Sequence, residues 1–286
     1  MAAQRVLMFV GAHPDDESFG PGGTLATYAS AGVKVVYTCA TRGEAGTADA
    51  QHLRGFATLG DLRWAELMCA AEKLRLAAVI PLGYRDSGMP GAPDNQHPRA
   101  LAAAPLEDVT RDVVAAIRDV QPQVVITFDP IGGYGHPDHI AVYQATTRAF
   151  HTAGDPRCFP EFGVPFTPQK LYSWVPRRGS LRLTVRVLRL LRRDPARVGR
   201  NRDVDLAGIA AVDFPIHARI HVPRDAVSRK HAALACHRSQ VAGASPLRRL
   251  VRLVSRCLTT DELFMRAHPR PSGRGVTEVD LFEGVR

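Results

Sequence analysis

Two short runs of acidic residues and histidines contain the side chains of this sequence that could bind a metal or catalyse a reaction. The first is Ala12-His13-Pro14-Asp15-Asp16-Glu17, and the second, far downstream, is His136-Pro137-Asp138-His139. Imidazole nitrogens and carboxylate oxygens are ligands that hold a catalytic zinc, which keeps one coordination position open for water. Together the two runs predict a metal site that serves hydrolysis.

Each run could instead be an ordinary strand-to-helix turn, because Asp caps helices and Pro favours turns. Two features favour the metal site. The first run packs three carboxylates into consecutive positions, which costs stability unless a cation offsets the repulsion. His136 and His139 are spaced so that both can face one point at the start of a helix. The residues alone leave open which of Asp15 and Asp16 is a ligand and which is a base.

Strands alternate with helices around these runs. The first run directly follows an apolar segment at residues 6–10, and the second follows one at 123–128 after a Gly-rich turn at 129–135; we expect both segments to be buried strands. Further strands are expected at 33–40 and 77–82, and helices at 22–31, 62–74 and 106–120. This order predicts an α/β fold, a Rossmann-like, mostly parallel sheet with helices on both faces. In such sheets ligands bind at the carboxyl ends of the strands, so the two runs should meet there.

We expect a single domain over residues 1–286. Its catalytic core is expected at 1–150, and residues 151–286 form a C-terminal extension that walls the cleft. The chain has 37 Lys and Arg against 28 Asp and Glu. Most of this excess lies in an Arg-rich insertion at 177–202, which contains ten arginines and one acid.

The Arg-rich insertion carries apolar residues at helical spacing, namely Leu181, Val185, Leu188 and Leu191. We interpret it as a basic helix that is solvated or contacts another subunit, with an anionic membrane surface as the alternative partner. No aromatic interleaving or nucleic-acid motif accompanies the arginines, so we expect no nucleic-acid partner. The sequence does not indicate an oligomeric state.

The five cysteines are odd in number and contain no C-x-x-C pair, which argues against a disulfide framework. A reduced, cytoplasmic location is expected. Only about ten residues precede the first acidic run, too few for a signal peptide. No apolar run approaches the roughly 18 residues that span a bilayer.

The two runs resemble those of the PIG-L/LmbE-like metal-dependent deacetylases. These enzymes remove N-acetyl groups from N-acetylglucosaminyl conjugates, and they include the mycothiol-pathway deacetylase and its conjugate-amidase relative. The likeness covers residues from about 6 to 150, with a further match near the end of the chain. The additional matching segments are Gly22-Gly23-Thr24-Leu25-Ala26, Thr41-Arg42-Gly43-Glu44-Ala45-Gly46, Arg63 with Glu66-Leu67, Arg85-Asp86-Ser87-Gly88-Met89, Gly132-Gly133-Tyr134-Gly135 and Cys236-His237-Arg238-Ser239-Gln240.

The resemblance implies that His13, Asp16 and His139 bind the metal. Zn²⁺ is expected, with Fe²⁺ or another divalent metal as the alternative. Asp15 would be the base that takes a proton from the metal-bound water. A carboxylate beside such a water can accept its proton, so the implied role agrees with the chemistry.

The second run would supply the acid. The resemblance implies that His136 is the general acid, held and tuned by Asp138, and that Tyr134 helps to stabilise the tetrahedral intermediate. A protonated imidazole can donate its proton to a leaving amine.

Arg63 and Asp86 match positions that contact sugar hydroxyls in the family. Charged groups at fixed positions can orient a neutral, hydroxyl-rich substrate by hydrogen bonds. Arg63 could instead pair with Glu66 on a helix surface, and Asp86 could simply form a turn with the residues that follow it.

Three further residues have supporting or open roles. Glu17 and Glu44 are expected to orient the metal ligands through hydrogen bonds. His237 lies in a matching motif, but its role is open.

The expected activity is that of a zinc-dependent hydrolase of a linear amide bond. It would hydrolyse the acetamide of an N-acetylglucosamine-containing small molecule to amine and acetate. An amidase of a thiol-sugar conjugate and a non-catalytic sugar- or membrane-binding protein are the alternatives. The aglycone of the substrate is expected to be selected by residues beyond 150.

Overall fold

The structure is a computed structural model, and it describes residues 4–198, 204–240 and 261–286. The described strands form one seven-stranded sheet in the order β3-β2-β1-β4-β5-β7-β6. The pairs from β3 to β5 are parallel, and β7 runs antiparallel to β5 and β6. The expected α/β class with a mostly parallel sheet is therefore confirmed. The strands are β1 (Val6–Gly11), β2 (Lys34–Thr41), β3 (Ala78–Tyr84), β4 (Val124–Thr127), β5 (Lys170–Val175), β6 (Ala218–Ile220) and β7 (Glu262–His268).

The strand order reverses at β1. This strand pairs with β2 on one side and with β4 on the other, and all three are parallel. The loops that follow β1 and β4 therefore meet at the crevice where sheets of this kind bind ligands. Both chemically rich runs lie in these two loops, as the sequence predicts.

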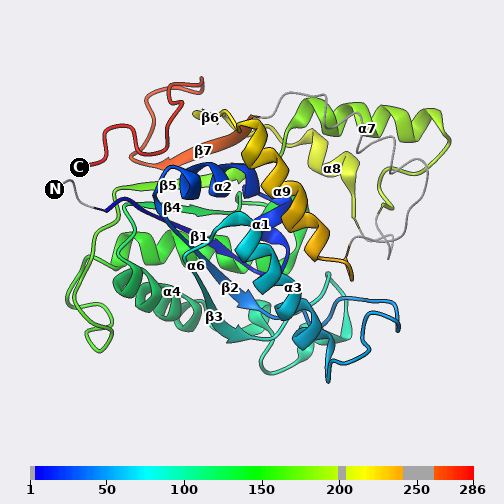
Figure 1. The fold of residues 1–286 in the computed structure, drawn as a ribbon, viewed down its shortest axis with the longest axis horizontal. Helices are drawn as coiled ribbons and strands as arrows, with labels where there is room; N and C mark the ends of the chain where they lie inside the picture. Colours follow the sequence, from blue (N-terminus) through cyan, green and yellow to red (C-terminus); the bar gives the residue numbers. More distant parts are fainter. Residues whose placement is uncertain (1–3, 199–203, 241–260) are drawn as a thin grey trace.

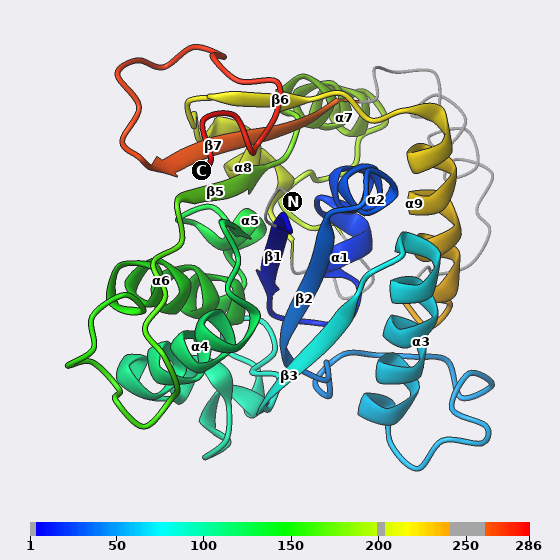
Figure 2. The same ribbon diagram turned by 60° about the vertical axis from the view of Figure 1, so that its left-hand side comes forward.

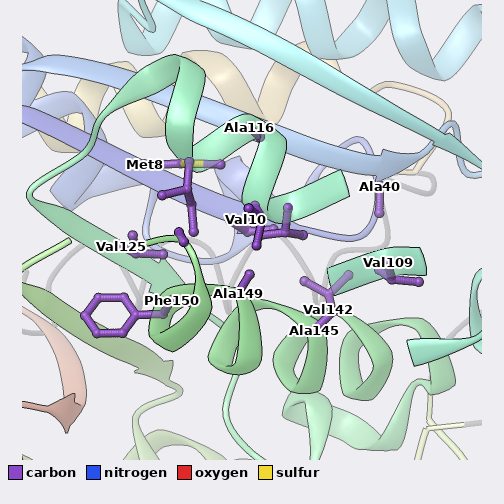
Figure 3. Close-up of a cluster of buried hydrophobic side chains, with 14 of the residues drawn as sticks. Met8, Val10, Ala40, Val109, Ala116, Val125, Val142, Ala145, Ala149 and Phe150 are labelled. Atoms are coloured by element: carbon purple, nitrogen blue, oxygen red, sulfur yellow. The ribbon is translucent and has the colours of Figure 1, made fainter. Parts of the chain in front are cut away.

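Helices cover both faces of the sheet (Figures 1 and 2). Met8 and Val10 of β1 enter a core with α4 and α6, whereas Leu7 and Phe9 point to the opposite face, toward α2 and α3. Figure 3 shows the first core, in which Val142 and its neighbours on α6 pack against β1. Burial on both faces explains why β1 is an unbroken apolar run. The helices are α1 (Asp16–Phe19), α2 (Gly22–Ser30), α3 (Leu59–Leu74), α4 (Leu106–Val120), α5 (Gly132–Gly135), α6 (Pro137–Thr152), α7 (Arg178–Leu190), α8 (Leu206–Ala211) and α9 (Arg224–Cys236), with 3₁₀ turns at Pro93–Gln96 and Leu101–Ala103.

Local capping sets where the helices begin. The helix expected at 62–74 begins three residues earlier, because Thr58 Oγ1 accepts the N–H of Asp61 at 3.1 Å and so caps α3. The helix expected at 106–120 is confirmed without change as α4. Apolar spacing thus predicts the body of a helix better than its first turn.

The Arg-rich insertion begins with α7, which packs against α8. Val185 is buried and Leu181 and Leu188 are half-buried, but Leu191 is exposed. The expected apolar face is therefore confirmed only in part, and residues 199–202 of the insertion lie outside the described residues. None of the described helices is long and apolar enough to cross a membrane.

One disulfide is present among the described residues, although the cysteine pattern argues against a disulfide framework. Cys69 of α3 and Cys236 at the end of α9 form a disulfide, with their Cα atoms 5.9 Å apart and 167 positions between them in the chain. Cys39 and Cys158 are free, and Cys257 lies outside the described residues. The pairing depends on α3 packing beside α9, which neither the number nor the local spacing of cysteines reveals.

Candidate metal centre and active site

The loop after β1 is held by its own side chains. Asp16 Oδ2 accepts the N–H groups of Ala12 and His13, at 2.9 and 2.7 Å. Asp15 has φ 118° and ψ −23°, a conformation that is unfavourable for residues other than glycine. The N–H of Asp15 donates to Glu17 Oε2 at 2.9 Å. One short turn therefore presents an imidazole and two carboxylates at the end of β1.

The loop after β4 closes onto the start of α6. Asp129 Oδ1 accepts the N–H groups of Ile131 and Gly133, at 3.0 and 2.9 Å. Gly132 has φ 64°, and a Cβ at this position would lie 2.9 Å from the Cβ of His139. Glycine is needed here both for the backbone conformation and for the close approach to His139.

Three imidazoles meet between the two loops. His13 Nδ1 lies 3.2 Å from His139 Nε2, and the ring centroids of His13 and His136 are 4.6 Å apart. The three residues are at most 6% exposed. Asp16 Oδ1 lies 3.4 Å from His139 Nε2. The structure therefore brings together His13, Asp16 and His139, the three expected ligands, and places His136 beside them.

Burial and neighbouring charges shift the pKa values of these imidazoles in opposite directions. Burial disfavours the charged form of His13, but the carboxylates of Asp86 and Asp138 outweigh it and raise the pKa of His13 well above its usual value. Burial, together with the charge on His13, lowers the pKa of His136 to about 3 and holds that of His139 well below its usual range. His139 is therefore neutral, which is the form in which imidazole binds a metal, whereas binding of a cation at His13 would have to displace a proton.

The donor set fits a divalent cation. The described residues contain two groups whose ligand atoms lie within 4.8 Å of one another, namely His13 with His136 and His139, and His13 with Asp86, His136 and Asp138. Of the three expected ligands, His13 and His139 are in these groups, and Asp16 contacts both of them. Asp138 Oδ1 is buried and has no hydrogen-bond partner among the described residues. Buried polar atoms without partners are costly, and a cation among them would remove that cost. Mixed imidazole and carboxylate donors suit Zn²⁺ and also Fe²⁺.

Asp15 is a carboxylate whose pKa moves toward neutrality. Burial raises the pKa of Asp15 to about 6, and Asp16 and Glu17 add to this shift while Arg63 opposes it. Arg63 Nη2 donates to Asp15 Oδ2 at 3.1 Å. A carboxylate with this pKa is ionised near neutral pH and can still accept a proton efficiently.

Arg63 is buried, so the alternative prediction that it pairs with Glu66 on the helix surface is wrong. The guanidinium donates to the carbonyl oxygens of Gly43 and Pro14, at 2.9 and 2.8 Å, in addition to Asp15. A Cβ at Gly43 would lie 2.0 Å from Arg63 Nη1, so this contact requires glycine. In the structure Arg63 therefore braces the loop that carries Asp15, whereas its expected contact with a sugar stays a prediction.

Asp86 forms the turn that was one of its two expected roles and also lies beside His13, whereas its expected contact with sugar hydroxyls stays a prediction. Its Oδ1 accepts the N–H of Gly88 at 2.8 Å, and the same atom lies 3.4 Å from His13 Nε2. Burial opposes ionisation of Asp86, but His13, Gly88 and Arg63 outweigh it and hold the pKa below its usual range. Glu44 Oε2 accepts the N–H of Asp86 at 3.1 Å, so Glu44 supports Asp86, whereas its expected role in orienting the metal ligands stays a prediction.

Asp138 and Tyr134 differ in how well their positions match their expected roles. The Asp138 carboxylate contacts His13 Nε2 at 3.0 Å and accepts the N–H of Ser87, whereas its contact with His136 is made by its backbone N–H, which donates to Nδ1. The Tyr134 ring packs edge-on against His136, with centroids 5.8 Å apart. Burial and nearby carboxylates raise the pKa of Tyr134 well above its usual value, so its hydroxyl stays protonated and can donate.

The sequence matches a known family over the loops that build this site. The model of the PIG-L family, described as GlcNAc-PI de-N-acetylase, matches residues 8–150. A 1D-myo-inositol 2-acetamido-2-deoxy-alpha-D-glucopyranoside deacetylase from Streptomyces scabiei is 36% identical over 98% of this chain and 89% of its own length. This chain belongs to the PIG-L family.

Solved structures share this PIG-L fold at low sequence identity. The N,N'-diacetylchitobiose deacetylase from Pyrococcus horikoshii superposes with a TM-score of 0.63 at 18% identity, covering 94% of this chain and 87% of that chain. The 4-carboxy-2-hydroxymuconate hydratase from Pseudomonas putida gives a TM-score of 0.57 at 20% identity, over 94% and 99% of the two chains. A hydratase thus has the same fold as a deacetylase, so the fold alone does not decide the reaction.

Sequence reasoning left the role of His237 open, and the structure places this residue behind Asp15. His237 Nε2 lies 2.7 Å from Glu17 Oε1, and both side chains are fully buried. Two residues further on, Ser239 donates through N and Oγ to Glu66, at 2.8 and 2.6 Å. The motif at 236–240 was the available signal, but its partners Glu17, Glu66 and Cys69 lie more than 160 residues earlier in the chain.

Proposed function

We propose that this PIG-L protein is a divalent-metal-dependent deacetylase that hydrolyses the acetamide of an N-acetylglucosamine unit, giving the free amine and acetate. The observation that carries the proposal is that Asp15 directly precedes Asp16, whose carboxylate oxygens lie 3.8 Å from His13 Nδ1 and 3.4 Å from His139 Nε2, while these two nitrogens are 3.2 Å apart. A base next to a buried set of metal donors is what amide hydrolysis requires, and it has no evident use in a protein that only binds sugar.

We assign the ligand role to His13, Asp16 and His139, with Zn²⁺ as the ion. When bound, such an ion supplies a Lewis acid that acidifies water and polarises a carbonyl. Asp15 accepts a proton as water attacks the acetamide carbon, and its raised pKa suits that role. Arg63 holds the Asp15 carboxylate in place through its hydrogen bond.

The segment that follows β4 supplies the groups proposed for the second half of the reaction. The C–N bond breaks as the amine takes up a proton, and we assign that proton transfer to His136. His136 is neutral at rest because its pKa is lowered, so in this proposal it receives the proton that Asp15 has taken from water and passes it to the leaving amine. Asp138 holds the loop in place through its contact with His13. The Tyr134 hydroxyl donates a hydrogen bond to the oxygen that becomes negative in the transition state.

The proposed substrate is a small glycoside, and we favour N-acetylglucosamine linked to inositol because the relative from Streptomyces scabiei is named for that compound. Arg63 and Asp86 are proposed to contact its sugar hydroxyls. The test is a screen for amine release over N-acetylglucosaminides with different aglycones, with acetate measured in parallel. Release of acetate from the inositol glycoside supports the assignment. Release of a bulkier acid from an acylated thiol-sugar conjugate, without acetate release, would make the protein an amidase instead.

Replacing Tyr134 by Phe tests the second loop. We expect kcat to fall by about 100-fold with little change in KM, because one donor to the developing oxyanion is removed. Steady-state acetate release gives both constants. Tyr143→Phe, which alters a tyrosine on α6 packed against the core, is the matched control and should retain nearly full activity. A larger effect on KM than on kcat in Tyr134→Phe would reassign Tyr134 to ground-state binding.

A further inference from the structure

The base Asp15 occupies a backbone conformation that needs external support. Its φ of 118° is one that residues with a Cβ rarely adopt. Its carbonyl accepts the N–H groups of Ser18 and Phe19, at 2.9 and 2.8 Å, and its own N–H donates to Glu17 Oε2. Such a residue keeps its orientation only while the groups around it stay fixed, so the position of Glu17 bears directly on that of the base.

Glu17 links Asp15 to His237, which lies 220 positions later in the chain than Glu17. Its side chain is fully buried. Oε2 accepts the Asp15 N–H, whereas Oε1 accepts the Ser18 hydroxyl at 2.5 Å and faces His237 Nε2 at 2.7 Å. A buried carboxylate is costly unless hydrogen-bond donors surround it. The donors that fix Glu17 are therefore the loop itself on one side and the ring of His237 on the other.

His237 is itself anchored to α3. The disulfide of Cys236 joins the preceding residue to Cys69, and Ser239 donates through N and Oγ to the buried Glu66. Figures 1 and 2 both show α9 lying alongside α3. The backbone on both sides of His237 is thus attached to α3, at Cys236 and at Ser239, which restricts movement of the His237 ring with Glu17.

Helix α3 also contacts Asp15 directly, through a residue of its own. Arg63 lies one turn before Glu66 on α3, and its guanidinium reaches Asp15 Oδ2 and the carbonyl of Pro14. Asp15 is therefore connected to α3 in two ways. Arg63 of α3 donates a hydrogen bond to the Asp15 carboxylate. The turn after α9, which is attached to α3, carries His237, and His237 contacts Glu17, which accepts the Asp15 N–H.

We propose that Glu17 and His237 are positioning residues for the base: the His237 ring fixes Glu17, and Glu17 fixes the backbone of Asp15 in its left-handed conformation. This proposal rests on the proposed deacetylase function. Neither residue touches substrate in this account. The role explains why a histidine from the C-terminal part of the chain is completely buried behind a loop at the end of β1.

The test compares His237→Ala with His237→Gln, whose amide can offer an N–H at the place of Nε2. We expect kcat of His237→Ala to fall by about 30- to 100-fold, because a misplaced base of this kind costs up to about 100-fold. KM and the metal content should stay at the wild-type level, and His237→Gln should recover most of the loss. Arg238→Ala, an exposed neighbour in the same turn, is the matched control and should keep its activity.

A double variant separates positioning from general damage. In the Asp15→Asn background the base is gone, so adding His237→Ala should cause no further loss of the residual rate. A further loss of similar size, or an unchanged kcat in His237→Ala alone, would overturn the proposal. If His237→Ala does not fold, His237→Asn replaces it in both comparisons, because the shorter Asn side chain does not carry an N–H to the place of Nε2, 2.7 Å from Glu17 Oε1. Failure of the wild-type enzyme to release acetate from any substrate would instead count against the proposed function.

Discussion

Asp15→Asn should lose about three orders of magnitude in kcat, in the middle of the range for removing a general base. The substitution keeps the size of the side chain and one hydrogen-bond acceptor for Arg63, but it removes the basic oxygen. A thousandfold loss corresponds to about 4 kcal/mol of transition-state stabilisation. Acetate release under steady-state conditions measures the rate, and elemental analysis of the purified variant measures its metal.

The metal content separates the base from a ligand. We assign metal binding to Asp16 and not to Asp15, so Asp15→Asn should hold as much metal as the wild type. Asp119→Asn, an exposed carboxamide variant on α4, is the control for the chemical change itself and should be fully active. An Asp15→Asn protein that keeps wild-type turnover, or one that loses its metal, would show that Asp15 has a different role.

His13→Ala is expected to remove both metal and activity. The side chain lies in both groups of clustered donors and contacts Asp138 and His139. Loss of an outer-shell partner alone weakens metal binding by roughly 10- to 100-fold, and loss of a direct ligand should exceed this. Metal bound per chain after dialysis is the measurement, and turnover should fall in proportion to it.

His136→Ala is the matched comparison for His13→Ala. The ring nitrogens of His13, His136 and His139 gather so closely that distance alone does not separate ligand from acid. We expect His136→Ala to retain its metal and to lose turnover. Metal retained in His13→Ala and lost in His136→Ala would exchange the two assignments.

The meeting of the two runs could be predicted because it follows from sheet topology. Val6–Gly11 and Val124–Thr127 are neighbouring parallel strands, so the residues that follow them must lie at one edge. His13 and His139 come together for this reason, although they are more than a hundred residues apart. No side-chain packing had to be known to expect it.

The hydrogen bonds and the disulfide that support the site could not be predicted, because each depends on how the helices pack against one another and against the sheet. Arg63 and Glu66 are spaced as a helix-surface pair, yet both are buried and bind other partners. Helical spacing records which residues share a face and not which element covers that face. The contact of His237 with Glu17 and the bond of Cys69 to its distant partner have the same origin in the packing of α9.

The most direct test of the central claim is the metal dependence of amide hydrolysis. Purified enzyme is stripped with a chelator, reloaded with Zn²⁺ or Fe²⁺, and given the inositol glycoside of N-acetylglucosamine, while acetate and free amine are both measured. Our account predicts that the two products appear in equal amounts, that the stripped enzyme is inactive, and that one of the metals restores turnover. Equal acetate release with and without metal, or no release after reloading with either ion, would contradict it.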